Sequence, residues 1–306
     1  MKGGIGPADG SDGSDGSDGS DGSDSSTILI TGSDIARPIG VSPALQQATD
    51  ANGNPQGWWP GNKWPPADLA GLWHNSHATK FPRNYWSFLH YSITVLGEFV
   101  RANAAGVEWD TIVLPPHPTG AALQAEIDEL VALVEYRPGV MTEALAQRTN
   151  LIAYWRGVLM FDSGSAPRTC DLIEIASHVG QFQAMHYKRK FDRPRPSQIS
   201  PSLLPPINPP GHPAYPSGHA TESRLMALCL AKVMPPAAST PVNPLPESSP
   251  LLAMAQRIAR NREVLGLHYP SDSKCGKQLA DASFDILMQC PSVPHLITEA
   301  KKEWWP

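Results

Sequence analysis

The segment RTCDLIEIASHVGQFQAMHYKR, residues 168–189, decides the fold class. Four of its apolar residues recur at positions i, i+3, i+7 and i+10, namely Leu172, Ile175, Val179 and Phe182. This spacing places them on one face of an α-helix, since a helix has about 3.6 residues per turn. We therefore expect a long helix that buries this face against other helices.

Helical periodicity also runs through the sequence on both sides of this segment, with proline and glycine at the junctions. Apolar stripes predict further helices over residues 86–103, 119–136, 139–161, 219–234, 250–265, 274–289 and 295–304. No stretch alternates apolar and polar residues for long enough to build a sheet. The sequence predicts an all-α fold, a bundle of long helices.

Composition places the chain among globular proteins. Its 306 residues are 41% hydrophobic and 17% charged, which suffices for a sizeable core. No run approaches the roughly 18 apolar residues of a membrane helix, so no membrane span is expected. The N-terminus MKGGIGPADG has no apolar stretch typical of a secretory signal. We expect a cytoplasmic protein, or one exported by a route that this sequence does not show.

The spacing of the four cysteines is uninformative about metals. Cys170, Cys229, Cys275 and Cys290 do not form C-x-x-C pairs, which favours neither a zinc site nor a redox motif. We expect free thiols that pack as small apolar side chains within helices.

The negative charge is concentrated at the N-terminus. The formal charge is −5, and residues 1–26 contain one lysine and six aspartates, so that 1 − 6 = −5 and the remainder is neutral. A neutral body without a basic stripe argues against nucleic acid as a partner. Residues 9–24 repeat Asp-Gly-Ser with a period of three, unlike the nine-residue calcium-binding repeat. We predict a disordered acidic tail over residues 1–26 and a single helical domain over residues 27–306.

The first part of that domain is irregular in sequence. Residues 27–85 contain STILITGSD, a candidate strand or extended arm, and a segment rich in tryptophan and proline that we expect to wrap the core. His74 and His77 have the spacing to share one helical turn over a metal. No third ligand is evident, so structural roles are favoured for both histidines.

Nine prolines occur from Pro194 to Pro216. They prevent a regular ladder of backbone hydrogen bonds, so a rigid irregular loop is predicted there. The loop joins the first two of three segments that carry reactive side chains.

The first of these segments is YKRKFDRPRPSQ, residues 187–198. A run of basic residues is usually a solvated surface. Here, however, Lys188 belongs to a strongly apolar helix, and Pro194 and Pro196 fix the backbone on both sides of Arg195. A rigid guanidinium suits bidentate recognition of an oxyanion, and a lysine adds a point charge.

The second segment is GHPAYPSGHATES, residues 211–223, which runs into a helical pattern. Ser217 is a good N-cap, and the helix is expected to begin at about Gly218 or His219. The backbone N–H groups of a helix N-terminus favour anions, and a glycine lets a ligand approach closely. His219 lies in the first turn, where it could serve as a general acid or base. Alternatively, Ser217 is only a cap and His219 only fills space.

The third segment is RNREVLGLHYPSD, residues 260–272. Arg262, His268 and Asp272 are spaced six and four residues apart, and Gly266 leaves room where the helix must end. Asp272 can hydrogen-bond one nitrogen of His268, which fixes the tautomer and leaves the other nitrogen as a nucleophile or metal ligand. The alternative is a helix terminus with a basic surface.

Together the three segments supply the parts of one oxyanion site. The positive charges come from Lys188, Arg195 and Arg262, and the neutral donors from Ser217 and Gly218. Three cations that lie close together repel one another strongly at a low effective dielectric. A bound multivalent anion would remove that penalty.

The three segments match the signature K-x6-RP, PSGH and R-x5-H-x3-D. On these motifs, which extend over about 85 residues, the chain resembles the superfamily of vanadium-dependent haloperoxidases, type-2 phosphatidic acid phosphatases and bacterial acid phosphatases. Asn261 departs from the pattern, which usually has serine there. The resemblance implies that residues 27–306 form the helical catalytic bundle of these enzymes.

By this resemblance the cofactor would be vanadate, with His268 as the axial vanadium ligand oriented by Asp272. The residues that would hold the vanadate oxygens are Lys188, Arg195, Ser217, Gly218 and Arg262. His219 would bond the apical oxygen and shuttle protons while hydrogen peroxide oxidises a halide, which then halogenates a small organic acceptor. In a phosphatase, His268 would instead attack phosphorus, and His219 would protonate the leaving oxygen.

Sequence context separates the branches of the superfamily. Its lipid phosphatases span membranes and its bacterial acid phosphatases are normally exported, and this sequence shows neither a span nor a signal. His212, seven residues before His219, resembles the bromoperoxidases, whereas chloroperoxidases tend to have an aromatic residue there. A role in capping the loop is the alternative for His212.

The expected activity is therefore oxidation of bromide or iodide, in preference to chloride, by hydrogen peroxide. The alternative is a soluble acid phosphatase that works through a phosphohistidine, and the remaining class is a helical protein that binds phosphate without turnover. Apolar helix faces would also allow a homo-oligomer, as occurs in the bromoperoxidase branch.

Overall fold

The structure is a computed structural model in which residues 81, 83–235 and 246–304 are described. The predicted acidic tail with its boundary at residue 26, most of the tryptophan-rich segment and the pair His74 and His77 lie outside these residues. From Ser87 onward the described residues belong to one compact unit. Residues 81 and 83–86 belong to a second, in which η3 (Arg83–Tyr85) is a 3-10 turn and Phe81 meets the edges of Tyr85 and Trp86.

The described chain is mostly helical, so the all-α class is confirmed. The helices are α3 (Phe88–Phe99), α4 (Gly120–Leu133), α5 (Arg137–Thr149), α6 (Leu151–Leu159), α7 (Pro167–Phe191), α8 (Pro196–Ile199), α9 (Gly218–Ala231), α10 (Pro250–Val264), α11 (Pro270–Leu287) and α12 (Ser292–Trp304). Short 3-10 turns are η4 (Val134–Tyr136) and η5 (Pro201–Leu203), and two strands are β1 (Asn103–Ala104) and β2 (Val107–Glu108). No helix among the described residues has the length and apolarity to cross a bilayer.

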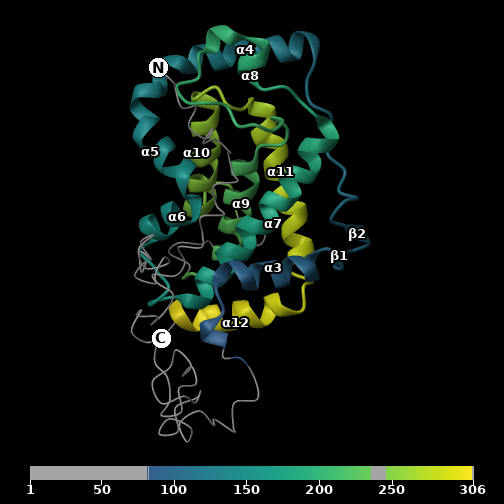
Figure 1. The fold of residues 1–306 in the computed structure, drawn as a ribbon, viewed down its shortest axis with the longest axis vertical. Helices are drawn as coiled ribbons and strands as arrows, with labels where there is room; N and C mark the ends of the chain where they lie inside the picture. The colour runs from purple at the N-terminus through teal and green to yellow at the C-terminus, as the bar shows by residue number, and fades with distance from the viewer. Residues whose placement is uncertain (1–80, 82, 236–245, 305–306) are drawn as a thin grey trace, which may run out of the picture. The chain divides into compact units, whose positions relative to one another are not determined.

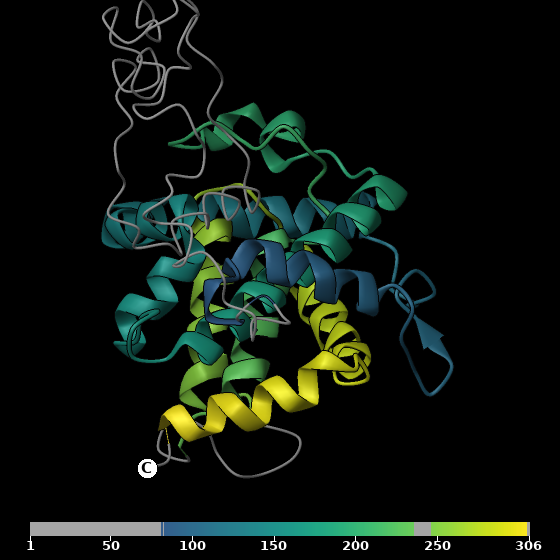
Figure 2. The ribbon, with the colours of Figure 1, turned by 60° about the horizontal axis from the view of Figure 1, so that its bottom comes forward.

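Helix α9 lies at the centre of the unit. It packs against α7, α10 and α11, while α3 and α12 pack on α7 and α5 packs on α10 (Figure 1). Leu225, Met226 and Leu230 of α9 are fully buried in the main core. Figure 2 brings one end of the unit forward and shows α12 running across it. A helix buried on all sides forms when other helices supply apolar faces around it.

Helix α7 confirms the face predicted from residues 168–189. Leu172, Ile175 and Val179 are completely buried, and Phe182 packs against the same core. Pro167 starts the helix, where its missing N–H costs nothing. The carboxylate of Glu303 on α12 accepts the N–H groups of the next two residues at 2.7 and 2.9 Å, and thereby caps α7 from a distant part of the chain.

Two predicted helices are shorter or divided. The helix expected over 139–161 is split, because Asn150 adopts an extended backbone and its side-chain oxygen accepts the Ala153 N–H at 2.7 Å as the N-cap of α6. The helix expected over 86–103 ends at Phe99, and the antiparallel pair of β1 and β2 follows. The expectation that no sheet forms was wrong for this hairpin. Its strands have two residues each and are too short to give an alternating pattern.

The proline-rich loop contains more regular secondary structure than predicted. It contains the single turn α8 and the 3-10 turn η5, each of which begins with a proline. Proline fits the first position of a helix because no partner is needed for its nitrogen there. The prolines therefore start short turns in addition to preventing long ones.

All four cysteines are buried free thiols, as the sequence predicted. Burial raises the pKa of the Cys170, Cys229 and Cys290 thiols to about 12 and that of Cys275 to about 11. Three lie within helices, and Cys290 lies in the turn between α11 and α12.

Helices α9 and α11 meet at an unusually close contact. A Cβ atom added at Gly276 would lie 2.7 Å from the backbone oxygen of Ser217 and 3.0 Å from the Ala220 Cβ. Only a residue without a side chain fits between the two helices at this point. Gly276 therefore sets the distance between the start of α9 and the first turns of α11.

We predict that Gly276→Ala destabilises the fold by about 1–3 kcal/mol, because backbone atoms of Ser217 must move to admit the methyl group. The matched control is Gly157→Ala in α6, where nothing lies within 4 Å and the helix should gain about 0.5–1 kcal/mol. Urea unfolding monitored by circular dichroism measures both changes. Equal effects of the two substitutions would contradict the close contact.

A second prediction concerns Glu174, which is buried on α7. Burial raises its pKa to about 8; the charge of Arg156 opposes this shift and that of Asp171 adds to it. At pH values between the ordinary glutamate pKa near 4.3 and this raised pKa, the unfolded chain loses a proton that the folded chain keeps. The free energy of unfolding therefore falls as the pH rises. Glu174→Gln should therefore become more stable relative to the wild type from pH 5 to pH 8, by about 3–4 kcal/mol.

Urea unfolding at several pH values measures this difference. The exposed Glu135→Gln variant, measured over the same pH range, serves as the control. Stability curves of Glu174→Gln and wild type that stay parallel with pH would refute the prediction.

Candidate active site

The residues of the three reactive segments lie where α7 and α10 end and where α9 and α11 begin. The Ser217 N–H, at the start of α9, donates to the Asp272 backbone oxygen at 3.0 Å and joins the first turns of α9 and α11. Helices α4 and α8 lie at the same end of the unit (Figure 1). Residues that are far apart in the sequence thus meet at one end of the bundle.

His268 is held by hydrogen bonds on both ring nitrogens. Its Nδ1 lies 3.0 Å from Asp272 Oδ2, which is the pair that the sequence predicted. Its Nε2 lies 3.1 Å from an Arg195 guanidinium nitrogen. A guanidinium only donates and a carboxylate only accepts, so the proton is on Nδ1 and the lone pair is on Nε2. The arrangement presents a basic nitrogen beside a fixed positive charge.

Asp272 is the centre of the hydrogen bonds around His268. Its Oδ2 also accepts the Tyr269 N–H at 3.0 Å, and its Oδ1 accepts from Arg193 at 2.6 Å. Burial alone would raise the pKa of Asp272, but the hydrogen bond with His268, the charge of Arg193 and the Tyr269 N–H together lower it below the usual value. The carboxylate therefore stays ionised and oriented inside the protein.

Arg193 is a positioning residue that the sequence analysis missed. Its guanidinium bridges Asp272 to Glu126 of α4, at 2.6 and 2.7 Å, and lies over the Tyr269 ring at 3.6 Å. Glu126 also accepts the Ser271 N–H at 2.7 Å. The only signal in the sequence is the alternation of arginine and proline in DRPRP, which fixes Arg193 and Arg195 alike. Its partner Glu126 lies 67 residues away and has no marker in the sequence.

Arg195 joins His268 to His212. Besides the His268 contact, it donates to the His212 backbone oxygen and to His212 Nδ1, both at 2.9 Å, and to the Leu267 oxygen at 2.9 Å. Arg195 is 3% exposed, so its orientation is set by these acceptors. A cavity of about 650 Å³ borders Arg195 and His212 and is otherwise walled mostly by residues of the proline-rich loop. The predicted rigid arginine is therefore present, with a second imidazole in contact.

Lys188 is fixed near the C-terminal end of α7. It is almost fully buried, and its Nζ donates to the backbone oxygens of Pro213 and Ala214 at 2.7 and 3.1 Å. A cation near a helix C-terminus is stabilised by the negative end of the helix dipole. These bonds tie Lys188 to the loop directly after His212.

Ser217 and Gly218 begin α9 as predicted. The Ser217 side chain accepts the Ala220 N–H at 3.4 Å, and Gly218 is the first helical residue. Both residues are buried, so the N-terminal N–H groups of α9 point into the protein interior. An anion placed there would meet the positive end of a 14-residue helix.

His219 and Arg262 both contact backbone oxygens of α5. His219 Nε2 lies 3.2 Å from the Gln147 backbone oxygen, and Arg262 donates to the Ala144 oxygen one turn earlier. Since a carbonyl only accepts, His219 carries a proton on Nε2. Asn261, the departure from the family pattern, points to the same helix and donates to the Gln147 side chain at 2.9 Å.

Gly266 ends α10 and directs the chain toward His268. It has φ of +73°, and its N–H and that of Leu267 donate to the oxygens of Glu263 and Arg262 at 2.8 and 3.0 Å. This is the Schellman arrangement, which requires a left-handed residue that is best supplied by glycine. The two catalytic candidates Arg262 and His268 therefore keep a fixed spacing.

The structure thus joins the predicted residues to different degrees. His212, Arg195, His268 and Asp272 form one chain of direct hydrogen bonds. The Ser217 N–H donates to the backbone oxygen of Asp272, and Lys188 donates to that of Pro213, the residue after His212. His219 and Arg262 instead contact backbone oxygens of α5. No protein-family model and no curated protein matches this chain.

We predict that Asp272→Asn destabilises the protein by about 3 kcal/mol or more, because the amide cannot accept from Arg193 on one side and from His268 and Tyr269 on the other. Asp281→Asn is the matched control. It also pairs with an arginine, Arg224, at 2.6 Å, but its side chain is 46% exposed, so its loss should cost about 1 kcal/mol or less. Urea unfolding of both variants at neutral pH measures the contrast, and similar losses would count against a special role for the buried pair.

Proposed function

We propose that this protein is a vanadate-dependent haloperoxidase that uses hydrogen peroxide to oxidise bromide or iodide. The observation that carries the proposal is the setting of His268, whose lone pair on Nε2 lies beside the Arg195 guanidinium. This lone pair now accepts the Arg195 N–H; if that N–H turned to an oxygen of a bound oxyanion, Nε2 could attach to the electrophilic centre of the anion. Asp272 on the opposite ring nitrogen strengthens this role, as carboxylates do behind ligating histidines.

The surrounding residues fit a tetrahedral oxyanion such as vanadate. The side chains of Lys188, Arg195 and Arg262 are 1%, 3% and 0% exposed, so these cations act at a low local dielectric. The start of α9 adds backbone donors at Ser217 and Gly218. These residues would hold the anion's oxygens, and His268 would bind its vanadium through Nε2.

Vanadate, when bound, would supply a Lewis acid that activates peroxide without changing its own oxidation state. Overall, one hydrogen peroxide and one proton would oxidise one bromide by two electrons to hypobromous acid and water. The acid would then replace a hydrogen of an organic acceptor with bromine and release a second water. The protein's part is to hold the anion and to move protons.

His219 would be the proton-transfer residue. Its Nε2 is committed to the Gln147 carbonyl, so proton exchange in this role goes through Nδ1. The ring is 1% exposed, which keeps its position fixed during turnover. Asp272 on Nδ1 would keep the tautomer of His268 throughout, while Arg195 would release Nε2 when the anion binds there.

His212 favours halide oxidation over phosphate hydrolysis. It adds a second imidazole, whose Nδ1 lies 2.9 Å from a guanidinium nitrogen of Arg195, and both residues border the 650 Å³ cavity. A phosphatase would need His268 as nucleophile and His219 as acid, with no part for His212. The same site would then hydrolyse phosphate esters through a phosphohistidine.

The deciding experiment is a parallel assay of the purified protein. With orthovanadate, hydrogen peroxide and bromide we expect bromination of a phenolic dye, and without vanadate we expect none. Hydrolysis of p-nitrophenyl phosphate without bromination would reassign the protein as a phosphatase, and neither activity would reject both.

His268→Ala should abolish bromination, since no other residue is proposed as the vanadium ligand. The control is His295→Ala, which removes an exposed histidine of α12 and should keep full activity. Elemental analysis should find vanadium in the wild type and in His295→Ala but not in His268→Ala. Activity retained in His268→Ala would show that the site is assigned to the wrong residue.

A further inference from the structure

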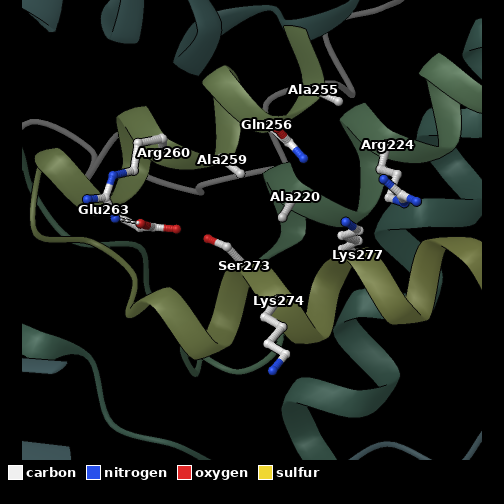
Figure 3. A pocket seen from close by; sticks show the side chains of 10 residues that line it. All are labelled: Ala220, Arg224, Ala255, Gln256, Ala259, Arg260, Glu263, Ser273, Lys274 and Lys277. Carbon is white, nitrogen blue, oxygen red and sulfur yellow. Dashed lines mark hydrogen bonds and ion pairs between the residues drawn. The ribbon is translucent and has the colours of Figure 1, made fainter. Parts of the chain in front are cut away.

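A second cavity, of about 380 Å³, lies between α9, α10 and α11 (Figure 3). Its apolar wall consists of the three small side chains Ala220, Ala255 and Ala259. All three are buried, so the space between the helices exists because alanines stand where larger side chains would fill it. Cavities of a few hundred Å³ with an apolar wall and a few polar groups are typical of small-molecule sites.

Three donors that line this cavity, one from each helix, converge on one carboxylate. Glu247 accepts from Arg224 of α9 at 3.0 Å, from Gln256 of α10 at 2.8 Å and from Lys277 of α11 at 2.7 Å. The Glu247 side chain is 45% exposed and precedes α10. The donors therefore form a carboxylate-binding group that a partly exposed side chain of the protein itself occupies.

The other end of the cavity offers a neutral hydroxyl and a buried carboxyl group. The oxygens of Ser273 and Glu263 point toward each other there (Figure 3). Arg260 lies 2.5 Å from Glu263 and also pairs with Glu129, so one guanidinium is shared between two carboxyl groups. This end suits a hydroxyl group of a ligand, which can both donate and accept.

We propose that this cavity binds a small hydroxylated aromatic carboxylate. The carboxylate would take the place of the Glu247 side chain on Arg224, Gln256 and Lys277. The ring would lie on the alanine wall, and the hydroxyl would reach Ser273 and Glu263. The site is separate from the candidate active site and does not depend on the proposed activity.

The test uses 4-hydroxybenzoate as probe, titrated calorimetrically into the full-length protein. We expect saturable binding to the wild type, and several-fold tighter binding to Glu247→Ala, because the competing carboxylate is gone. Lys277→Ala should weaken binding about tenfold. Lys274 lies one turn away on the same helix and also lines the cavity, but its ammonium points away from it (Figure 3), so Lys274→Ala is the matched control and should bind nearly as the wild type does.

Measurements on two further variants test the orientation of the bound probe and its location. Ser273→Ala should weaken 4-hydroxybenzoate about fivefold and leave benzoate unchanged. His268→Ala should bind the probe normally; loss of binding there would place the probe in the candidate active site and overturn the proposal. So would the absence of saturable binding to both wild type and Glu247→Ala up to about 10 mM, or equal weakening by Lys274→Ala and Lys277→Ala.

Discussion

The buried ion pair between Arg193 and Asp272 is the interaction on which the candidate active site depends. Both side chains are almost completely removed from solvent, and breaking such a pair leaves a charge that water cannot reach. Through Asp272 it fixes His268, and through Glu126 it fastens α4 to the start of α11. One arginine from the proline-rich loop therefore connects the reactive imidazole to a helix that carries no reactive residue of its own.

Local regularities made the helices predictable. The apolar face of α7 and the capping serine of α9 follow from residues close in sequence, and both were confirmed. The division at Asn150 was missed because the apolar stripe continues on both sides of it, although asparagine is favoured at N-caps over helix interiors. The short turns in the proline-rich loop were missed because proline was considered only as a helix breaker.

The contacts of the candidate site were likewise predictable only between residues that are close in the sequence. Asp272 and His268 are four residues apart, so their hydrogen bond could be expected from spacing. The contacts of Arg195 with His268, of Arg193 with Glu126 and of Arg262 with α5 join residues 67 to 118 positions apart, and no local pattern encodes them. Sequence motifs thus named the reactive groups, while the helices α4 and α5 that position them could be found only from the fold.

The burial of every cysteine has a practical consequence. A thiol reacts with oxidants and alkylating reagents as the thiolate, and thiols with a pKa of about 11 to 12 inside the core form almost none at neutral pH. Sulfur at the surface is instead supplied by Met160, which is 88% exposed. The native chain is therefore a suitable background for spectroscopic labels, because a single cysteine introduced at the surface would be the only site that maleimide reagents modify.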